Sequence, residues 1–369
     1  MDFGFTEEQE LLRSEVRKWL DQSCPLDEVR RITEAEGGEG FSREQWKEIA
    51  ALGWLGLTIP EAHGGAGLGW VDLVVVLEET GRSLFPSPLV SSTVAAAALL
   101  EAGSPEQQAR WLPGLADGTR IGTLAAQESP GAPSAAAVQL EGRIDGDRTV
   151  LSGEKRFVPD ACAATLYVVP FRRDGDLFLA LVERDAPGVG AEDWPGMDLT
   201  KRLGRLSLQD VRVSADAILP GEGLDRILDR ATAAVTCEMI GAAEGAVSLT
   251  AEFAKQRVQF GSPVGRYQAV KHPLAEMHVD VESAKSLLYY SAWCLDESPE
   301  EAPRYVSMAK ALLSDAFARI GIDAVQLHGA VGYTWEYDPH LYLKRSKWAR
   351  PMYGDSGFHY DRIADLGGL

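Results

Sequence analysis

A run of short strand patterns lies between two stretches of helical patterns, and this order most constrains the fold. Apolar residues recur about every 3.6 positions over residues 1–120 and again over 224–350. Between these stretches, β-branched residues and Asp-Gly turns repeat at short spacing. Because strands do not alternate with helices, a doubly wound sheet is excluded. We predict an α+β chain with a helical domain at 1–120, an antiparallel β domain at 121–222 and a helical domain at 223–369.

The individual elements follow from the same patterns. Thr6 begins a capping box that starts the first helix. The Ala-rich run at 231–254 is apolar nearly all round, which predicts a helix buried in a bundle or an oligomer interface. Further helices are expected at 42–53, 70–84, 91–103, 104–117, 264–296 and 302–328. Strands are expected at 136–140, 149–151, 165–171, 177–182 and 205–213.

The chain is strongly acidic, with 36 basic and 55 acidic side chains and a net charge of -19. A uniformly acidic surface repels polyanions, so no nucleic-acid partner is expected. The acidity is uneven, because residues 251–350 hold 12 basic and 12 acidic side chains. An anionic cofactor is therefore still compatible with that part of the chain.

The sequence favours a cytoplasmic protein without a membrane span. Residues 83–100 carry no charge, but two prolines and four serines interrupt them, so we expect a loop followed by a buried helix. The N-terminus has no apolar segment typical of a signal peptide. The cysteines form no CxxC pair, which favours reduced thiols and no metal site; they are Cys24, Cys162, Cys237 and Cys294.

Two motifs at the ends of long helices carry chemistry. No GxGxxG follows a strand, so a Rossmann site is not expected. Arg257 offers a planar charged fork suited to a pyrophosphate, and Phe260 an aromatic face. Gly329 and Gly332 allow a backbone to approach a ligand closely. Each motif alone is explained better as a helix end, through a cation complementing the helix dipole or a packed aromatic cluster.

Together the two motifs resemble a known family. RVQFGSPVGRYQAVKHPLAEM and QLHGAVGYTWEYD are similar to the C-terminal helical domain of the acyl-CoA dehydrogenase family. The opening FTEEQELLRSEVRKWL, the connection IPEAHGGAGLG and the central strand segment stand in that family's order. The resemblance covers essentially the whole chain.

The resemblance implies both a fold and an activity. The fold is an N-terminal helical domain, a middle β domain and a C-terminal four-helix bundle. The expected activity is α,β-desaturation of an acyl-CoA thioester with non-covalently bound FAD. The expected partners are a homologous subunit, in a homo- or hetero-oligomeric dimer or α2β2 tetramer, and an electron-acceptor flavoprotein.

The resemblance also assigns cofactor residues. In the family, the flavin ring lies between the β domain and the C-terminal helices, and the neighbouring subunit completes the adenine-pyrophosphate end. The residues aligned with contacts to the partner's FAD are Arg257, Gln259, Phe260, Gln268, Gln326, Gly329 and Gly332. The further aligned cofactor residues are Gln127, Phe157 and Asp355.

The β-domain flavin segments depart from the family pattern. Where the family has Thr-Glu-Pro-Gly-Ala-Gly-Ser, this chain has Glu-Ser-Pro-Gly-Ala-Pro-Ser after Gln127. Where the family has Trp-Ile-Thr, this chain has Phe157-Val158-Pro159. Pro159 has no backbone N–H and lacks the hydroxyl that a threonine offers to flavin N5. Phe157 retains an aromatic ring for stacking.

Neither family position for the catalytic base holds a carboxylate. The reaction removes an α-proton, which needs a positioned base. Tyr353 occupies the usual glutamate position and Ala231 the alternative one, and a phenol is a poor base near neutral pH. Asp229, Glu238 and Asp355 lie nearby in sequence and are also explained as capping, exposed or otherwise satisfied carboxylates. The catalytic residue is therefore left unassigned.

Four interpretations remain open from the sequence. The chain is a subunit of a heteromeric acyl-CoA dehydrogenase that lacks the base, as in bacterial enzymes acting on sterol or bile-acid side chains. It is a self-sufficient dehydrogenase with another carboxylate as the base. It is a flavin-dependent monooxygenase of the same fold, which needs no α-proton base. Or it is a structural subunit without flavin of its own.

Overall fold

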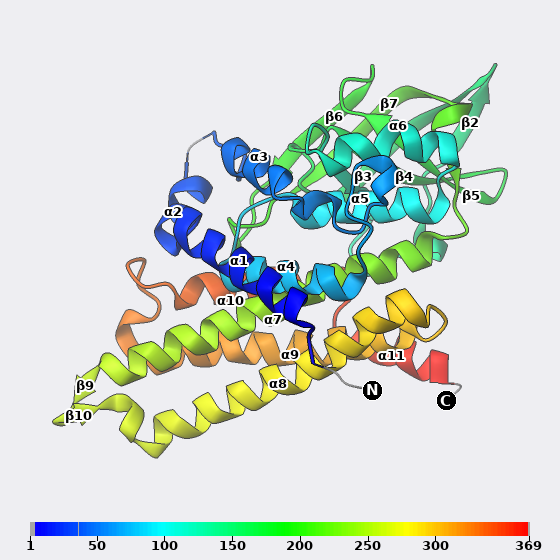
Figure 1. The fold of residues 1–369 in the computed structure, drawn as a ribbon. Helices are drawn as coiled ribbons and strands as arrows, with labels where there is room; N and C mark the ends of the chain where they lie inside the picture. Colours follow the sequence, from blue (N-terminus) through cyan, green and yellow to red (C-terminus); the bar gives the residue numbers. More distant parts are fainter. Residues whose placement is uncertain (1–3, 36, 368–369) are drawn as a thin grey trace. The chain divides into compact units, whose positions relative to one another are not determined.

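The computed structural model describes residues 4–35 and 37–367, which fall into two compact units (Figure 1). The first, called here the helical unit, lies within Met1–Arg31, Trp70–Phe85 and Thr232–Leu369. The second, called the sheet unit, lies within Ile32–Gly69 and Pro86–Ala231. The predicted class, helices followed by strands and then helices, is confirmed.

The helical unit is built on three long helices. α8 packs along α9, and α10 and α11 pack on α9 as well. Lys285 of α8 forms an ion pair with Glu244 of α7, with Nζ 2.9 Å from Oε2. The helices wholly in this unit are α1 (Glu7–Ser23), α4 (Trp70–Arg82), α8 (Gln268–Glu297), α9 (Ala302–His328), α10 (Pro339–Ala349) and α11 (Ser356–Gly367). Two more belong to it in part: α2 (Leu26–Thr33) as far as Arg31, and α7 (Leu224–Gln256) from Thr232 onward. Figure 1 shows the hairpin of β9 (Val258–Gln259) and β10 (Ser262–Pro263) at one end of α7 and α8.

The first helix starts where its capping box predicts. The Thr6 side chain accepts a hydrogen bond from the backbone N–H of Gln9, and the Gln9 side chain accepts one from the backbone N–H of Thr6. Two otherwise unpaired backbone donors are thereby satisfied. Val16 and Leu20 form the buried face of this helix.

α4 and α7 cross with their backbones in contact. A Cβ added at Gly81 would lie 2.1 Å from the carbonyl oxygen of Glu238, and one at Gly241 would lie 1.7 Å from that of Glu78. Only glycine fits at such a crossing, because any Cβ would force the two helices apart. The buried, Ala-rich part of α7 around this crossing matches the prediction from its apolar pattern.

Replacing Gly241 by alanine is expected to destabilise the protein. The added methyl group has no space beside Glu78, so the free energy of unfolding should fall by about 2 kcal/mol. Urea unfolding followed by circular dichroism measures the loss. Gly357→Ala in α11 is the matched control, since its Cβ would meet nothing closer than 3.4 Å. Equal stability of the Gly241→Ala variant and the wild-type protein would contradict the close crossing.

The sheet unit contains two four-stranded sheets. One has the order β1-β4-β5-β8 and the other β2-β3-β7-β6. All pairs are antiparallel except that of β1 with β4, which is parallel. The strands are β1 (Gly122–Leu124), β2 (Gly142–Asp145), β3 (Arg148–Pro159), β4 (Leu166–Arg173), β5 (Asp176–Glu183), β6 (Val189–Trp194), β7 (Leu203–Ser214) and β8 (Ile218–Pro220).

The strand predictions are confirmed for β3, β4, β5 and β7, and one is wrong. Asp174 and Gly175 form the two-residue turn between β4 and β5, both with positive φ. The strand expected at 136–140 is instead a 3-10 turn, Ala135–Ala137, and the strand begins at Gly142. The Ser134 side chain caps that turn by accepting from the Ala137 N–H. A local side-chain hydrogen bond thus overrides the apolar strand pattern.

The sheet unit also contains α-helices. They are α3 (Arg43–Ala51), α5 (Leu89–Ala102) and α6 (Pro105–Ala116). α5 packs on β1 and α6, and its residues from Leu89 to Leu99 are all buried. The uncharged segment 83–100 is therefore a loop and a buried helix, as its sequence predicts. No helix among residues 4–35 and 37–367 has the length and apolar character needed to cross a membrane.

Candidate functional site

The first motif forms an exposed hairpin directly after α7. The Val264 N–H donates to the Arg257 carbonyl over 2.7 Å, and the Tyr267 hydroxyl donates to the Gln259 carbonyl over 3.3 Å. Phe260 at the tip has φ +51 and a side chain 93% exposed. A left-handed backbone and a fully exposed phenyl ring are costly in a folded chain. The hairpin therefore presents an aromatic face for another molecule to cover.

The second motif ends α9 in a tight glycine turn. Gly329 has φ +64, a conformation that favours glycine, and a Cβ there would meet no atom within 4 Å. A Cβ at Gly332 would lie 2.3 Å from the Val325 carbonyl oxygen, so the chain turns back closely on α9. Gln326 and Gly329 are exposed at this end. The open space above Gly329 allows a ligand to approach the backbone.

The structure brings the ends of α7 and α9 together. The ring of Phe253, in the last turn of α7, stacks on that of His328, the last residue of α9, with centroids 4.2 Å apart. Phe253 also contacts Tyr337 edge-on at 6.2 Å. Arg257 follows Phe253 by one helical turn, and its N–H donates to the Phe253 carbonyl. The two motifs thus form one surface, called here the helical half-site.

The helical half-site has the chemistry that an FAD adenine-pyrophosphate end requires. The residues assigned to it from the sequence are exposed, except Gly332; they are Arg257, Gln259, Phe260, Gln268, Gln326 and Gly329. They offer a guanidinium fork, amide donors and an aromatic face. Burial lowers the pKa of His328, whose ring stacks on that of Phe253. The residues present therefore fit the group.

In the sheet unit, the two expected flavin segments lie side by side. The Arg156 N–H donates to the Gln127 carbonyl over 2.7 Å, which places Phe157 next to the segment that follows β1. Phe157 has φ +51 and contacts Trp194 edge-on at 5.3 Å. The Gln127 amide donates to the carbonyls of Ser129 and Gly131 and so shapes its own loop.

A buried ion pair holds this pair of segments and was not predicted. Lys155 Nζ donates to Glu128 Oε1, and the same carboxylate accepts from the backbone N–H groups of Gln139 and Leu140. Burial lowers the pKa of Lys155, while the contact with Glu128 opposes the shift. A lysine in an apolar strand position next to Phe157 is the signal that sequence reasoning missed.

The residues at the two expected base positions, Ala231 and Tyr353, are both buried. Ala231 in α7 is fully buried and has no ionisable group. Tyr353 lies in the loop between α10 and α11 with φ +56, and its side chain is only 9% exposed. Neither residue brings a carboxylate to its position.

The three nearby carboxylates lie in different surroundings. Asp355 is exposed and caps α11, since its Oδ1 accepts from the Phe358 N–H at 3.0 Å. Glu238 is buried in α7 with its Oε2 3.9 Å from Nη1 of Arg345, itself buried in α10. Asp229 is also buried. The contacts of Asp355 and Glu238 are those of a helix cap and an ion pair, which gives each a structural role.

Two buried side chains contact backbone carbonyls of the loop that contains Tyr353, and neither was predicted as a site residue. Lys310 of α9 donates from Nζ to the carbonyls of Ala349, Arg350 and Gly354. His359 Nε2 lies 3.1 Å from the Tyr353 carbonyl oxygen. The sequence signal is a lone lysine on the apolar stripe of α9, one turn after Val306.

The buried contact of His359 with the Tyr353 carbonyl predicts that the protein loses folding stability at acidic pH. Burial, with Lys310 and Arg362 nearby, lowers the pKa of His359 to about 3. Because an unfolded histidine titrates near pH 6.5, the unfolded chain binds the extra proton first, and stability falls as the pH drops below that value. Between about pH 6.5 and about pH 5, His359 should cost about 2 kcal/mol of stability.

The measurement compares urea unfolding of the wild-type protein and His359→Gln at both pH values. Glutamine retains an N–H donor and does not titrate, so the stability difference between the two proteins should change by that amount. A constant difference across this pH range would contradict the assignment.

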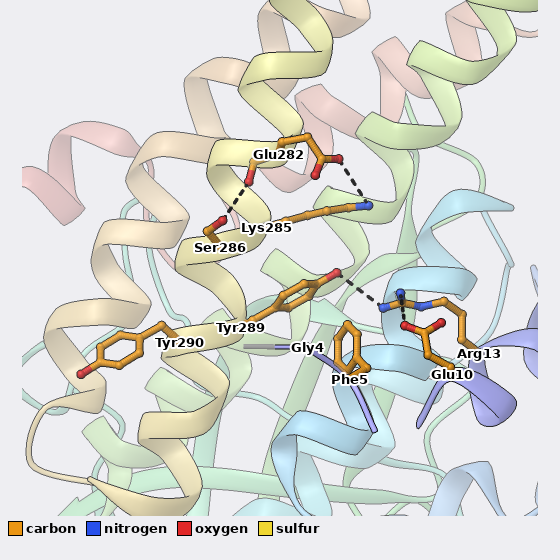
Figure 2. A pocket seen from close by; sticks show the side chains of 9 residues that line it. All are labelled: Gly4, Phe5, Glu10, Arg13, Glu282, Lys285, Ser286, Tyr289 and Tyr290. Atoms are coloured by element: carbon orange, nitrogen blue, oxygen red, sulfur yellow. Dashed lines mark hydrogen bonds and ion pairs between the residues drawn. The ribbon is translucent and has the colours of Figure 1, made fainter. Parts of the chain in front are cut away.

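A separate hollow of about 480 Å³ lies between α1 and α8 in the helical unit (Figure 2). Three of its lining residues, Arg13, Lys285 and Tyr289, contact Glu78, to which the Tyr289 hydroxyl donates over 2.8 Å. Burial raises the pKa of Glu78, and Lys285 and Arg13 oppose that shift. The lining carries acidic side chains, Glu10 and Glu282, as well as basic ones, Arg13 and Lys285, so its charge favours neither anionic nor cationic ligands. None of the site residues expected from the sequence lines it.

Family models match both helical parts of the chain. The model of the acyl-CoA dehydrogenase N-terminal domain matches residues 6–119, and that of the C-terminal domain matches residues 224–366. Among curated proteins, the acyl-CoA dehydrogenase IpdE2 of Mycolicibacterium smegmatis is 32% identical over 355 residues, covering 95% of each chain.

Solved structures of similar proteins share the whole fold. The ChsE4-ChsE5 complex from Mycobacterium tuberculosis includes a chain that superposes with a TM-score of 0.91 at 29% identity, covering 100% of this chain and 99% of that one. A variant of Tcur3481-Tcur3483, described as a steroid ACAD, gives a TM-score of 0.89 at 32% identity, covering 98% of each chain. The expected enzyme class, an acyl-CoA-dehydrogenase-like flavin oxidoreductase, is confirmed by these matches. With its two matching domains, its fold and its relatives in agreement, the chain belongs to the acyl-CoA dehydrogenase family.

Proposed function

We propose that this chain is the subunit of a heteromeric FAD-dependent acyl-CoA dehydrogenase that lacks the catalytic base. One observation carries the proposal: the two motifs expected to bind FAD meet in one surface, while the two positions expected to hold the base are Tyr353 and Ala231, neither of them a carboxylate. A chain with a cofactor-binding surface but no proton acceptor can complete the active site of a partner, whereas its own active site lacks the base. The names of the relatives support this, since ChsE4-ChsE5 is a complex of two differently named proteins.

In this proposal the helical half-site holds the adenine-pyrophosphate end of the partner's FAD. Arg257 donates its guanidinium fork to the pyrophosphate, a strong charge-assisted and bidentate contact. Phe260 covers an apolar face, and the amides of Gln259, Gln268 and Gln326 supply neutral donors. FAD held there would supply the hydride acceptor for the β-carbon of the acyl chain.

The chain's own β-domain segments are poorly suited to a second flavin. Pro159 replaces a residue that donates both an N–H and a hydroxyl, and its carbonyl is already taken by the Thr123 hydroxyl at 2.7 Å. Phe157 still offers a ring at the edge of Trp194. We therefore propose one FAD for each pair of unlike subunits, with Gln127 and Phe157 shaping an incomplete second site.

The α-proton step separates this chain from its partner. A tyrosine phenol, as at position 353, is a poor base near neutral pH compared with a carboxylate, so this chain lacks a suited acceptor for the α-proton of an acyl-CoA thioester. The partner subunit supplies the glutamate, and an electron-acceptor flavoprotein reoxidises the enzyme. We place this α2β2 tetramer in the cytoplasm, because the four cysteines form no disulfide, as is typical of a reducing compartment.

The experiment is co-expression with a homologue that carries glutamate at the position of Tyr353. We expect the two chains to copurify, with one FAD per unlike pair and acyl-CoA-dependent bleaching of the flavin under anaerobic conditions. The matched control is the lone chain, which should show neither stoichiometric flavin nor turnover. Ordinary dehydrogenase turnover by the lone chain would overturn the proposal and favour another carboxylate as the base.

The same preparation tests the other interpretations. Substrate-dependent oxygen consumption with formation of a hydroxylated product would favour a monooxygenase. Equal flavin content of the partner homologue purified with and without this chain would favour a purely structural subunit.

A further inference from the structure

A completely buried amine binds the loop that carries Tyr353. Lys310 Nζ lies 3.1 Å from the carbonyl oxygen of Ala349 and 2.8 Å from those of Arg350 and Gly354. Its fourth neighbour is Ser314 Oγ at 3.2 Å, one turn further along α9. The side chain has no exposed surface. A single amino group thus ties both ends of the loop to the core helix α9.

The bound loop has an unusual backbone. Tyr353 and Gly354 follow each other with φ +56 and +108. A Cβ at Gly354 would lie 2.3 Å from Phe358, so this turn is also crowded. His359 meets the Tyr353 carbonyl from α11. Backbone conformations of this kind persist only where the surroundings hold them. Lys310 and His359 supply that hold from two different helices.

A lysine is a costly choice for this place. Burial lowers the pKa of Lys310 to about 7, the Asp355 carboxylate opposes the shift, and the Arg350 guanidinium adds to it. An apolar side chain of equal length would fill the same space without that cost. In return, three backbone carbonyls each accept a hydrogen bond from Lys310. Buried carbonyls without a donor would themselves be destabilising. The geometry is therefore that of a clamp on the loop.

We propose that Lys310 is a positioning residue that holds the loop Arg350–Gly354 and thereby the orientation of the side chain at position 353. The proposal rests on the proposed function, in which position 353 corresponds to the base of the catalytically complete relatives. A base acts only within hydrogen-bond reach of the proton it removes. A displacement of about 1 Å at such a site lowers the rate by about 100-fold. The clamp determines whether the loop presents its side chain at that place.

The first test measures the loop directly and does not depend on flavin chemistry. Backbone amide hydrogen exchange is followed on the full chain in the wild type and in Lys310→Met, which removes all donors at similar length. Exchange in the 350–358 segment should accelerate at least about tenfold, while the hairpin at 258–267 is unchanged. Lys285→Met is the matched control, because Lys285 is a largely buried lysine of the same unit that pairs with Glu78 instead. It should leave the 350–358 segment unchanged.

Two results of this test would overturn the clamp. Unchanged exchange at 350–358 would show that Lys310 does not hold the loop. A uniform rise through α9, α10 and α11 would show that Lys310 serves only general stability. Should Lys310→Met not accumulate as folded protein, Lys310→Gln retains an amide donor and should give an intermediate acceleration confined to the same segment.

The second test separates positioning from binding. In a Tyr353→Glu background, adding Lys310→Met should lower the maximal rate of deuterium washout from α-deuterated octanoyl-CoA at least about tenfold, while the thioester concentration that gives half of that rate stays within about twofold. Equal changes in both quantities would contradict a positioning role. If Tyr353→Glu shows no washout at all, the assignment of position 353 to the base in the proposed function fails, whereas the hydrogen-exchange result still decides the role of Lys310. The two failures are therefore distinguishable.

Discussion

Replacing Tyr353 by glutamate is expected to give this chain the proton-abstraction step that it lacks. A positioned general base contributes about 10²–10⁴-fold to a proton transfer. In the proposed function position 353 corresponds to the base, and Lys310 and His359 contact backbone carbonyls of the loop around it. We therefore expect the washout of deuterium from the α-carbon of α-deuterated octanoyl-CoA to rise by at least about 100-fold in the assembled protein. Mass spectrometry of the recovered thioester measures this step separately from hydride transfer.

Two variants control this experiment. Tyr353→Phe removes the hydroxyl without adding a carboxylate and should give no washout. Tyr360→Glu adds a carboxylate at an exposed position of α11 and should also give none. Washout in the Tyr360→Glu variant equal to that in Tyr353→Glu would show that any nearby carboxylate suffices, and would contradict the assignment of position 353.

Removing the guanidinium of Arg257 is expected to strip FAD from the assembled oligomer. Charge-assisted hydrogen bonds contribute about 1.5–3 kcal/mol each, so losing a bidentate contact with the pyrophosphate should weaken FAD binding by roughly 100-fold or more. Arg257→Ala should therefore copurify with little flavin, measured by visible absorbance after release of the cofactor. The fold should persist, because Arg257 is exposed and lies beyond the end of α7.

Arg266→Ala is the matched control for that loss. Arg266 lies in the same connection after the hairpin, is exposed and donates to the Ser262 hydroxyl. Its removal changes the net charge equally but leaves the helical half-site intact. Unchanged flavin occupancy in Arg257→Ala, or equal loss in both variants, would refute the assignment of Arg257 to the pyrophosphate.

Local patterns predicted the elements well, because helices and hairpins depend on neighbours in sequence. The capping box at Thr6, the Asp174-Gly175 turn and the buried Ala-rich helix are confirmed. The strand expected at 136–140 is wrong, since the Ser134 side chain caps a short turn there. The flavin residues and the domain boundaries remain predictions that carry the proposals above.

Long-range contacts could not be predicted in the same way. The stacking of Phe253 on His328 joins two motifs that lie far apart in sequence. The pairing of Glu238 with Arg345 gives a structural role to a carboxylate that otherwise remains a candidate base. Each depends on how separate helices meet, and no local pattern contains that information.

The sequence by itself determined the order of helices and strands, and it predicted the cofactor residues and base positions that carry the proposals above. These follow from periodicity and from residue identity, which need no neighbours in space. Only the tertiary structure decided that Lys310 and His359 hold the loop of Tyr353, and that the ends of α7 and α9 form one surface. A buried lysine or histidine takes its role from the carbonyls that it meets, and these come from segments brought together only by packing.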